Sequence, residues 1–422
     1  MAGALRPLAH AILGEPLPIR VEAWDGSGIG PLDGPGTLRV TPEALRRFLW
    51  SPDQLGLGRA FVAGDLQMEG DVLAILDELE GVQHGDLRLA ARALAAAWPT
   101  LRLPGVLGGP LPPPPEEIRP HGRRHSMRRD RTVVSHHYDV GNEFYEIVLG
   151  PAMTYSCARF ASDHVDLADA QADKHELICR KLGLHEQPGR RLLDVGCGWG
   201  SLALHAAAHH QAQVVGITIS REQADRAQAR VREAGLDRLV DIRLQDYREL
   251  AGEQFDAISS VGMFEHVGSE RMRQYFEVLH ERLVPTGRLL NHAISSVGGS
   301  RLGGRSFVHR YVFPDGELID VGEVVLAMER AGFQVRDVES LREHYARTLR
   351  CWVGNLRRGW DRAVELVGPN RARVWLLYMA ASAIGFADGG IDLHQVLGVV
   401  PDEHGNSGMP RTRDEWATAN PT

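Results

Sequence analysis

The stretch LLDVGCGWG, residues 192–200, decides the fold of this chain of 422 residues, and SLALHAAAHH (201–210) follows it directly. A short apolar run that breaks into three glycines and then into an alanine-rich segment predicts a strand, a tight turn and the start of a helix. Gly196, Gly198 and Gly200 let the main chain approach a ligand at positions where a Cβ atom would collide with it. The turn therefore predicts a ligand site at the end of this strand.

Three ligands compete for this turn. A phosphate loop requires a GxxxxGK motif ending in serine or threonine, and no lysine follows here. A dinucleotide site requires GxGxxG and an acid about 20 residues later, whereas this turn reads GxGxG and the next strand ends in GITIS (216–220), without a carboxylate. S-Adenosylmethionine has no pyrophosphate to seat and tolerates the shorter turn. Glycine also serves packing at such turns, but the place of this one in a series of alternating strands and helices favours the methyl donor as cofactor.

The sequence around the turn alternates between apolar runs and helical patterns. Six segments read as strands: 190–198, 212–220, 240–245, 255–262, 287–296 and 333–341. Helical segments such as 221–235 separate the early ones, which predicts a mainly parallel sheet with ligands above the carboxyl ends of its strands. Residues 341–386 read as helical and rich in arginine and tryptophan. We therefore expect an α/β fold, a Rossmann-like sheet with a helical cap, joined to a smaller, mostly helical or mixed N-terminal domain.

Composition narrows the class of protein. A net charge of −8 gives no argument for a nucleic-acid partner. Four cysteines, at positions 157, 179, 197 and 351, form no CxxC pair, which is poor for zinc or a disulfide framework and fits a reducing cytosol. We predict no metal, no signal peptide and no membrane span, since no uncharged apolar run approaches the ~18 residues that a span requires. An enzyme acting on lipid would then be cytoplasmic and peripherally associated with the inner face of the membrane.

The expected domains are residues 1–102 at the N-terminus, a linker over 103–131, a catalytic domain over 132–400 and a polar tail over 401–422. The linker begins with six prolines and three glycines and ends in RPHGRRHSMRRDR (119–131), which holds six arginines. This basic run is either a solvated hinge or a contact for anionic lipid headgroups. Together with the amphipathic segment 87–98, it motivates the hypothesis that the protein lies against an anionic bilayer.

Five ordered motifs carry a family resemblance: HYDVGNEFYEIVLGPAMTYSCARF (137–160), LLDVGCGWGSLALHAA (192–207), VVGITISREQ (214–223), SVGMFEHVG (260–268) and YVFPDGEL (311–318). Over about residues 132–390 the chain resembles the cyclopropane fatty acid synthase family of S-adenosylmethionine-dependent methyltransferases. The first hundred residues look like the lipid-associating domain of the phospholipid-acting members, which the mycolic acid cyclopropane synthases lack. The resemblance thus implies unsaturated phospholipid acyl chains as substrate, and a homodimer. FPDG (313–316) departs from the FPGG common in the family, a turn change from which we expect little consequence.

The resemblance also implies the chemistry. The π electrons of a cis alkene attack the methyl group of the donor, and a bound bicarbonate ion removes a proton from the new methyl group so that a ring closes. The matching positions are Cys157, Glu265, His292, the Ile294 backbone N–H and Tyr345, with Tyr138 lining the site. His292 and Tyr345 are expected to donate hydrogen bonds to the anion, and Glu265 to accept one from its hydroxyl. Taken alone, a cysteine such as Cys157 is more often a small buried hydrophobe and a histidine such as His292 more often a hydrogen-bonded core residue, while Tyr345 could simply pack its ring in the helical cap.

For the cofactor, the resemblance implies three groups of residues. Tyr155 and Ser156 would lie near its methionine part, and the turn after the first strand would contribute Asp194, Gly196, Gly198 and Gly200. Thr218, Ile219 and Gln223 follow the second strand, where Thr218 would bond the ribose in place of the missing acid. Asp246 and Tyr247 follow the third strand and would contact adenine.

Other functions stay open at this point. Some family members stop at a methylene or methyl branch, in certain cases with a flavin-dependent reductase as partner. The sequence does not separate that outcome from a ring, because both products need the same cation and the same base. A small-molecule methyltransferase would share the turn but lack the anion site, and a non-enzymatic lipid-binding protein would not bind the donor.

Overall fold

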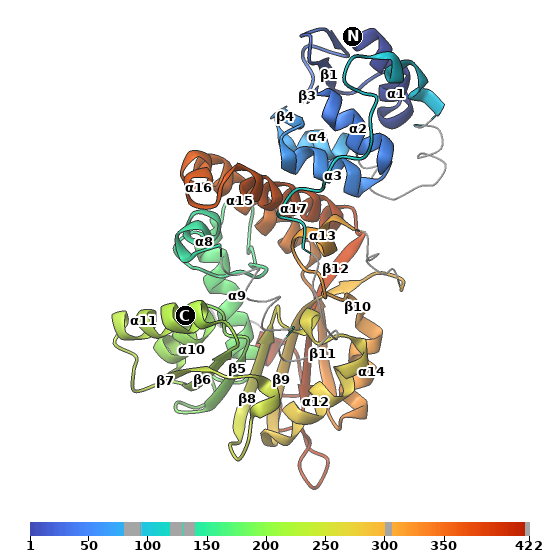
Figure 1. Ribbon diagram of the computed structural model, residues 1–422. Coiled ribbons are helices and arrows are strands. Elements are labelled where there is room, and N and C mark those ends of the chain that lie inside the picture. Colours follow the sequence, from blue (N-terminus) through green and yellow to red (C-terminus); the bar gives the residue numbers. More distant parts are fainter. Residues whose placement is uncertain (80–92, 94, 119–128, 130–139, 300–305, 418–422) are drawn as a thin grey trace. The chain divides into compact units, whose positions relative to one another are not determined.

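The computed structural model describes residues 1–79, 93, 95–118, 129, 140–299 and 306–417 (Figure 1). Contacts divide the chain into two compact units. Unit 1 comprises Met1–Arg119, Gly303–Pro314 and Gly359–Ile384, and unit 2 comprises Pro120–Leu302, Asp315–Arg358 and Gly385–Thr422. Each unit is therefore assembled from segments that are distant in the sequence, and the domain boundaries expected from the sequence stay a prediction.

Unit 1 combines a small sheet with short helices. Its four strands follow the order β2 (Gly28–Ile29), β1 (Arg20–Ala23), β3 (Gly36–Val40), β4 (Leu66–Gly70), with only β1 and β3 parallel. Its helical elements are α1 (Ala2–Leu13), α2 (Pro42–Trp50), α3 (Gln54–Ala63), α4 (Val72–Glu78), the 3₁₀ turn η1 (Trp98–Arg102), α13 (Phe307–Tyr311), α16 (Trp360–Val367) and most of α17 (Pro369–Ala387). This is the mixed architecture expected for the N-terminal part.

The described part of the predicted linker, residues 103–118, packs within unit 1. Val106 is buried in the core of that unit. Arg47 Nη1 donates to the Pro112 carbonyl at 2.7 Å, and Trp50 Nε1 donates to the Gly108 carbonyl at 3.0 Å. The side chain of Arg59 forms a two-bond ion pair with the buried carboxylate of Glu117. Proline-rich sequence lacks the donors of regular structure, so these side chains of α2 and α3 bond its carbonyls and its acid instead.

Unit 2 is built on a sheet of seven strands in the order β11-β12-β9-β8-β5-β6-β7, with an eighth, β10, beside β9. All six predicted strands are present: β5 (Arg191–Val195), β6 (Gln213–Thr218), β7 (Val240–Leu244), β8 (Phe255–Val261), β9 (Leu283–Ser296) and β11 (Gln334–Ser340). β5 to β9 pair in parallel, as predicted. Two further strands, β10 (Ile319–Asp320) and β12 (Ile391–Val399), were not predicted, and β12 runs antiparallel between β9 and β11.

Helices cover both faces of this sheet (Figure 1). One hydrophobic core joins Leu192 and Val214 to α9 (Leu167–Lys181), α10 (Ser201–His210) and α11 (Arg221–Glu233). The other joins Leu193 and Val215 to α12 (Met272–Glu281) and α14 (Val321–Arg330). Neighbouring residues of one strand thus enter opposite cores, because side chains alternate across a sheet.

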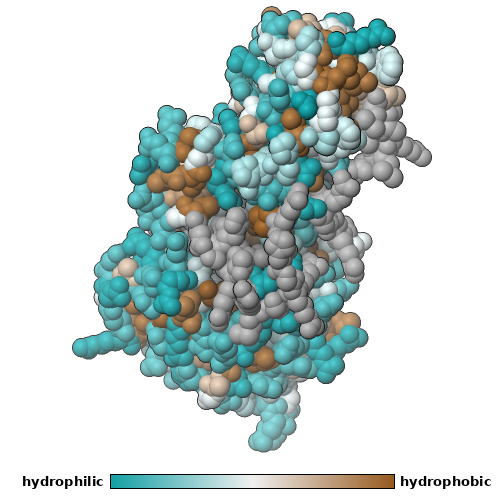
Figure 2. Space-filling view, in the orientation of Figure 1, coloured by the Kyte–Doolittle hydropathy of each residue, from teal (hydrophilic) through white to brown (hydrophobic). Residues whose placement is uncertain are grey.

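The remaining elements of unit 2 are short, apart from α15. They are α8 (Asn142–Leu149), η2 (Tyr247–Glu249), η3 (Phe264–His266), η4 (Ser269–Arg271), α15 (Arg342–Arg358) and α18 (Asp414–Ala417). The helical segment predicted over 341–386 is confirmed as α15, α16 and α17. Within the described ranges, no helix combines the length and apolar character needed to cross a bilayer. Figure 2 shows hydrophobic residues of the visible face in separate patches among hydrophilic ones.

Candidate active site

A cavity of about 1340 Å³, part of it open to solvent, lies in unit 2 at the carboxyl ends of the parallel strands. Its walls come from the segments that follow β5, β6, β7 and β8, together with residues 153–156 and the face of α9 that carries Lys174 and His175. This is the edge of the sheet where the sequence placed a ligand. Ten of the eleven predicted cofactor residues line it: Tyr155, Ser156, Asp194, Gly196, Gly198, Thr218, Ile219, Gln223, Asp246 and Tyr247.

The glycine turn has the backbone that the sequence predicted. Gly196, Gly198 and Gly200 have φ angles of 76°, 54° and 79°, in the region that favours glycine. A Cβ atom on Gly198 would meet nothing within 4 Å, so this glycine leaves open space at the cavity wall. Gly200 was predicted to bind the cofactor, but it does not line the cavity. It caps α10, and a Cβ atom at this position would lie 3.3 Å from Ala227 Cβ. Its conformation serves the helix start and packing.

Polar side chains line the cavity wall in the segments that follow β6 and β7 in the sequence. Thr218 Oγ1 donates to Gln223 Oε1 at 2.8 Å, which joins two residues predicted to act on the ribose side. The buried carboxylate of Asp246 accepts from Arg248 Nε at 2.8 Å and from Arg248 Nη2 at 2.6 Å. Sequence reasoning missed Arg248, which also lines the cavity. The acid expected to face adenine is therefore held by a neighbouring guanidinium.

A buried lysine on α9 was also missed. Lys174 Nζ donates to Ser156 Oγ at 3.0 Å, and burial lowers the pKa of Lys174 to about 7. Burial likewise raises the pKa of Asp194 to about 6, although Ser259 Oγ donates to this carboxylate at 2.7 Å. The signal in the sequence was a lysine on the buried stripe of a helix, beside Ala170 and Ile178, where a charge is costly without a partner or a role.

Three of the predicted catalytic residues lie on or beside β9. The Ile294 backbone N–H donates to Glu265 Oε1 at 2.8 Å, whereas Glu265 Oε2 is buried and has no hydrogen-bond partner among the described residues. His292 lies two residues before Ile294 on the same strand and is fully buried. Its Nδ1 lies 3.2 Å from Gln395 Nε2, and its Nε2 is also without a partner in the described part of the chain.

The environment of these two groups shifts both of their pKa values. Burial raises the pKa of Glu265 to about 7, although the hydrogen bond from Ile294 opposes this shift. Burial, together with the charges of Lys174 and Lys181, lowers the pKa of His292 well below its usual value. The imidazole is therefore neutral at pH 7. A donation from the Gln395 amide to Nδ1 leaves the hydrogen of the ring on Nε2, the atom without a partner.

Cys157 and Tyr345 meet at a second point. The Cys157 thiol donates to the Ala158 carbonyl at 3.1 Å and lies 3.7 Å from the Leu341 carbonyl, which also accepts the Tyr345 backbone N–H. Burial raises the pKa of the Cys157 thiol, so it stays protonated. The Tyr345 ring packs edge-on against Trp352, with 6.0 Å between ring centroids, and Trp352 in turn contacts the ring of Tyr155.

These catalytic candidates adjoin the cavity, and Tyr138 lies outside the described residues. Glu265 lies between Met263 and His266 in the sequence, and Cys157 follows Ser156. Met263, His266 and Ser156 line the cavity, whereas Glu265, Cys157, His292, Ile294 and Tyr345 do not. The structure thus joins Glu265 to Ile294 by a hydrogen bond, and Cys157 to Tyr345 through the Leu341 carbonyl.

Asp315, the residue of FPDG that differs from the FPGG common in the family, forms an ion pair that the sequence did not predict. Arg129 Nε and Nη2 donate to the two oxygens of Asp315, both at 2.6 Å. Asp315 is buried and lines the cavity. The expectation of little consequence was wrong, because glycine at this position would leave Arg129 without this two-bond partner.

Comparisons with known proteins agree with this geometry. A family model described as mycolic acid cyclopropane synthetase matches residues 125–396. A probable fatty acid methyltransferase of Mycobacterium tuberculosis is 43% identical over 408 residues, which are 93% of either chain. The cyclopropane-fatty-acyl-phospholipid synthase of Escherichia coli K12 is 39% identical over 272 residues, which are 64% of this chain and 69% of that relative.

A solved structure of a related enzyme matches about two thirds of this chain. The mycolic acid cyclopropane synthase CmaA1, crystallised with SAH and CTAB, matches 64% of this chain and 98% of its own, with a TM-score of 0.60 and 34% identity. The predicted fold class is thereby confirmed. With its cavity at the strand ends and its match over residues 125–396, the chain belongs to the mycolic acid cyclopropane synthetase family and is an S-adenosylmethionine-dependent methyltransferase.

Proposed function

We propose that this enzyme methylates the cis double bond of an unsaturated acyl chain in a membrane phospholipid, and that bicarbonate-assisted loss of a proton then closes a cyclopropane ring. The observation that carries the proposal is the pair of buried atoms without partners, Glu265 Oε2 and His292 Nε2. Glu265 Oε2 is a hydrogen-bond acceptor at a pH above the pKa of this carboxyl group. His292 Nε2 carries the hydrogen of the ring and is a donor. A buried donor and acceptor left unpaired cost free energy unless a ligand satisfies both.

The cavity residues fit S-adenosylmethionine. This cofactor supplies an activated methyl group on a sulfonium. The open space at Gly198 accommodates close contact with the main chain, and Asp194, Ser156 and Lys174 offer charged and hydroxyl partners for an amino acid group. Thr218 and Gln223 supply hydroxyl and amide groups for a ribose, and the ring of Tyr247 supplies a face for a base.

The anion site fits bicarbonate, which supplies the base. Bicarbonate has one hydroxyl and two further oxygens, so it needs one acceptor and several donors. In this proposal the ionised Glu265 accepts the hydroxyl hydrogen, His292 Nε2–H and the Tyr345 hydroxyl donate, and the Cys157 thiol closes the site. The Ile294 N–H already donates to Glu265, so here it orients the carboxylate. Exclusion of water strengthens each of these interactions.

The atoms balance in a simple way. The alkene carbon forms a bond to the methyl carbon, and the electron pair of the carbon–sulfur bond stays on sulfur. Bicarbonate would then take one proton from the new methyl group, and the electron pair of that C–H bond would form the second carbon–carbon bond, which closes the ring and removes the positive charge. The lipid gains one CH₂ in total.

The same relatives support a second candidate function. The relative that is 43% identical matches nearly the whole of this chain and is named a probable fatty acid methyltransferase. If a hydride first shifts from the methylated carbon to the neighbouring cationic carbon, and the proton then leaves from the new methyl group, the electron pair of that C–H bond forms the double bond of a methylene branch. A separate flavin-dependent reductase would then give a methyl branch.

Features of unit 1 support a lipid substrate at a membrane surface. An apolar cavity there is lined by fifteen residues, all of them apolar: Leu5, Leu8, Ala9, Ile12, Leu13, Val21, Leu38, Val40, Ala44, Leu45, Phe48, Leu57, Ala60, Leu66 and Leu79. The four most exposed large hydrophobic residues in the described ranges, Leu32, Trp50, Trp98 and Leu107, also belong to unit 1 and are 58–79% exposed. Exposed tryptophan and leucine favour the interface of a bilayer. We therefore propose peripheral association with the inner face of the membrane.

A product assay tests the function. The purified enzyme is incubated with S-adenosylmethionine and vesicles of dioleoyl phosphatidylglycerol, with bicarbonate and in carbonate-free buffer. Mass spectrometry is expected to show an acyl chain heavier by one CH₂, formed faster with bicarbonate. Mild hydrogenation separates the isomers, since an exocyclic methylene takes up hydrogen and a cyclopropane ring does not. An enzyme that binds the donor and leaves the lipid unchanged would contradict the proposal and favour a small-molecule substrate.

A further inference from the structure

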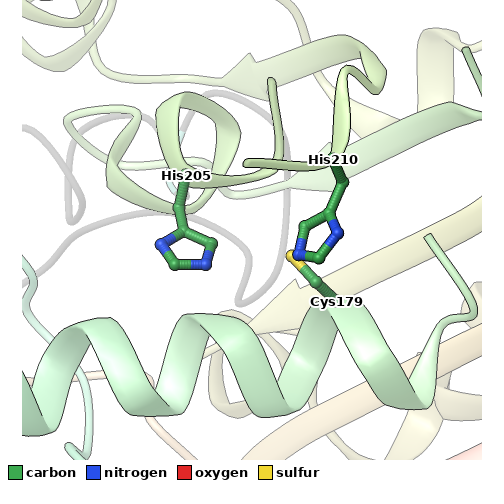
Figure 3. Close-up of side chains that lie close together, drawn as sticks. All are labelled: Cys179, His205 and His210. Carbon is green, nitrogen blue, oxygen red and sulfur yellow. The ribbon is translucent and has the colours of Figure 1, made fainter. Parts of the chain in front are cut away.

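A cluster of metal-binding side chains lies between α9 and α10, outside the residues that line the cavity. Cys179 is on α9, and His205 and His210 are on α10 (Figure 3). One donor atom from each of the three residues lies within 4.8 Å of the others. Glu176 lies one helical turn before Cys179, and its carboxylate is hydrogen-bonded to both imidazole rings. Its Oε2 lies 3.3 Å from His205 Nε2 and 2.9 Å from His210 Nε2. Four side chains from two helices thus converge.

These four groups are the donors that zinc prefers. Thiolate, imidazole and carboxylate are the usual protein ligands of Zn²⁺, which takes four of them in a tetrahedron. Bond lengths of about 2.0–2.1 Å to nitrogen or oxygen and about 2.3 Å to sulfur place neighbouring donor atoms about 3.3–3.6 Å apart. The two distances from Glu176 to the imidazoles already approach this edge length. The sulfur lies within 4.8 Å of one donor atom of each imidazole, so binding of the ion requires the thiolate to move closer to the other ligands.

Charge and exposure also suit a divalent cation. Cys179 is fully buried, whereas the side chains of His205 and His210 are only slightly exposed and that of Glu176 is about a third exposed. The site is therefore accessible to solvent near Glu176 and buried from solvent near Cys179. A thiolate, a carboxylate and two neutral imidazoles would leave a bound Zn²⁺ with no net charge. Arg180, 3.7 Å from the other Glu176 oxygen, orients that carboxylate.

We propose that Cys179, His205, His210 and Glu176 bind one Zn²⁺ ion, which fastens α9 to α10. Both helices form walls of the cofactor cavity, α9 through Lys174 and α10 through Ser201. The ring of His175, which also lines the cavity, lies 5.6 Å from the ring of His205. The ion is structural, since four protein ligands leave no open position for chemistry. It holds the two walls at a fixed spacing.

The spacing of these residues in the sequence explains why we predicted no metal. Zinc motifs are recognised chiefly by CxxC pairs, and the four cysteines form none. Glu176 and Cys179 lie three positions apart and His205 and His210 lie five apart, but 26 positions separate Cys179 from His205. The packing of α10 on α9 in the tertiary structure brings the groups together.

Metal titration of the full-length protein, without a histidine tag and after treatment with a chelator, tests the site. We expect wild type to take up one equivalent of Zn²⁺ in competition with a chromophoric chelator. Co²⁺ is expected to give the absorption of a thiolate–cobalt bond. Cys179→Ser should abolish this absorption and weaken Zn²⁺ binding at least 100-fold, and His210→Asn should weaken binding to a similar extent. Cys351→Ser and His164→Ala, which change a half-buried cysteine and an exposed histidine outside the cluster, should bind as wild type does.

A second readout addresses the fastening of the helices. Added Zn²⁺ should raise the unfolding temperature of wild type and of Cys351→Ser but not that of His210→Asn. Circular dichroism identifies a variant that fails to fold, in which case the His210→Asn result decides, because this side chain lies near the surface. Wild type that binds less than half an equivalent, or folded Cys179→Ser and His210→Asn that keep wild-type affinity, would overturn the proposal.

Discussion

The backbone N–H of Ile294 donates a hydrogen bond of 2.8 Å to Oε1 of Glu265, which fixes a buried carboxylate beside β9. The same strand carries His292 two residues earlier. The Oε2 atom of Glu265 and the Nε2 atom of His292, both buried and both without a partner in the described ranges, thus belong to residues on or beside this strand. The first prediction addresses this arrangement.

Glu265→Gln keeps an oxygen that accepts from Ile294 but removes the ionisable group. We expect kcat to fall by about 100-fold or more, because the acceptor for the hydroxyl hydrogen of the anion is lost. The pKa of Glu265 is raised to about 7, so the fraction of active carboxylate grows as the pH rises through neutrality. Wild-type kcat should therefore rise between pH 6 and 8, and the slope should vanish in the variant.

Rates of lipid methylation measured across this pH range, with and without bicarbonate, provide the check. The exposed Glu270→Gln is the matched control, five residues away, and should retain the wild-type profile. A Glu265→Gln enzyme with wild-type rate and bicarbonate response would remove Glu265 from the mechanism.

Lys174→Met should stabilise the protein at low pH. The pKa of Lys174 is lowered from 10.5 to about 7, so the unfolded chain holds a proton between these pH values that the folded protein has lost. Stability from this group is present above pH 10.5 and is lost as the pH falls through 7. The variant should exceed wild type by roughly 2 kcal/mol at pH 6, and the difference should shrink towards pH 10.

Denaturant unfolding at a series of pH values measures this effect. Lys181→Met is the contrasting variant on the same helix, because Lys181 pairs with Asp337 at 2.9 Å and with Glu339. Its loss removes the paired lysine from Glu339 and leaves Asp337 with Arg413, at 2.6 Å, as its remaining cation, so the protein should lose stability at neutral pH. If Lys174→Met and Lys181→Met changed the free energy of unfolding equally, burial of Lys174 would not be what destabilises its charged form.

Gly198→Ala should weaken cofactor binding at least tenfold. Its φ of 54° is unfavourable for alanine, and its Cβ atom would occupy open space at the cavity wall. Gly235, with φ of 67° and open space around a Cβ atom, lies outside the cavity lining. Both alanine variants should lose about 1 kcal/mol of stability. Calorimetry with S-adenosylhomocysteine should show weaker binding for Gly198→Ala alone; equal affinities would show that the turn does not touch the cofactor.

Asp315→Gly, which restores the residue common in the family, should destabilise this protein by about 3 kcal/mol. The substitution removes the carboxylate that both nitrogens of the Arg129 guanidinium contact, and leaves a largely buried charge. The double variant Arg129→Met, Asp315→Gly should be more stable than Asp315→Gly, with a coupling energy of about 1–3 kcal/mol. Urea unfolding of the four proteins measures the cycle, and additive effects would mean that the pair contributes nothing.

The Arg-rich segment 119–131 can be tested by vesicle flotation. Arg123→Ala, Arg124→Ala and Arg128→Ala, combined, should lower the partition onto anionic vesicles about 100-fold, because each basic residue contributes about 1 kcal/mol near such a surface. Arg129 is left in place since it pairs with Asp315. Vesicles of neutral phosphatidylcholine serve as the control. Unchanged flotation on anionic vesicles would mean that this segment is a solvated hinge.

Local patterns were sufficient for much of the fold and of the cofactor site. The strands β5 to β9 and β11 could be predicted because each combines a short apolar run with a turn at its end. The tight turn at Gly196 and Gly198, where both residues have a positive φ, was expected from three glycines that follow an apolar run. Gly200 lies outside the cavity lining and caps α10, because glycine serves a helix start and a ligand turn by the same conformational freedom.

The sequence by itself determined the class of fold, the position of the cofactor turn and the family, since each depends on residues that are neighbours along the chain. The tertiary structure alone decided which distant residues meet: Glu265 with Ile294, Arg129 with Asp315, Lys174 with Ser156, and Cys179 with two histidines of α10. It also assembled each unit from separate segments and placed β12 in the sheet. The physical reason is that burial, pairing and pKa depend on contacts across the core, and hydrophobic periodicity specifies which face of an element is buried but not which partner it meets.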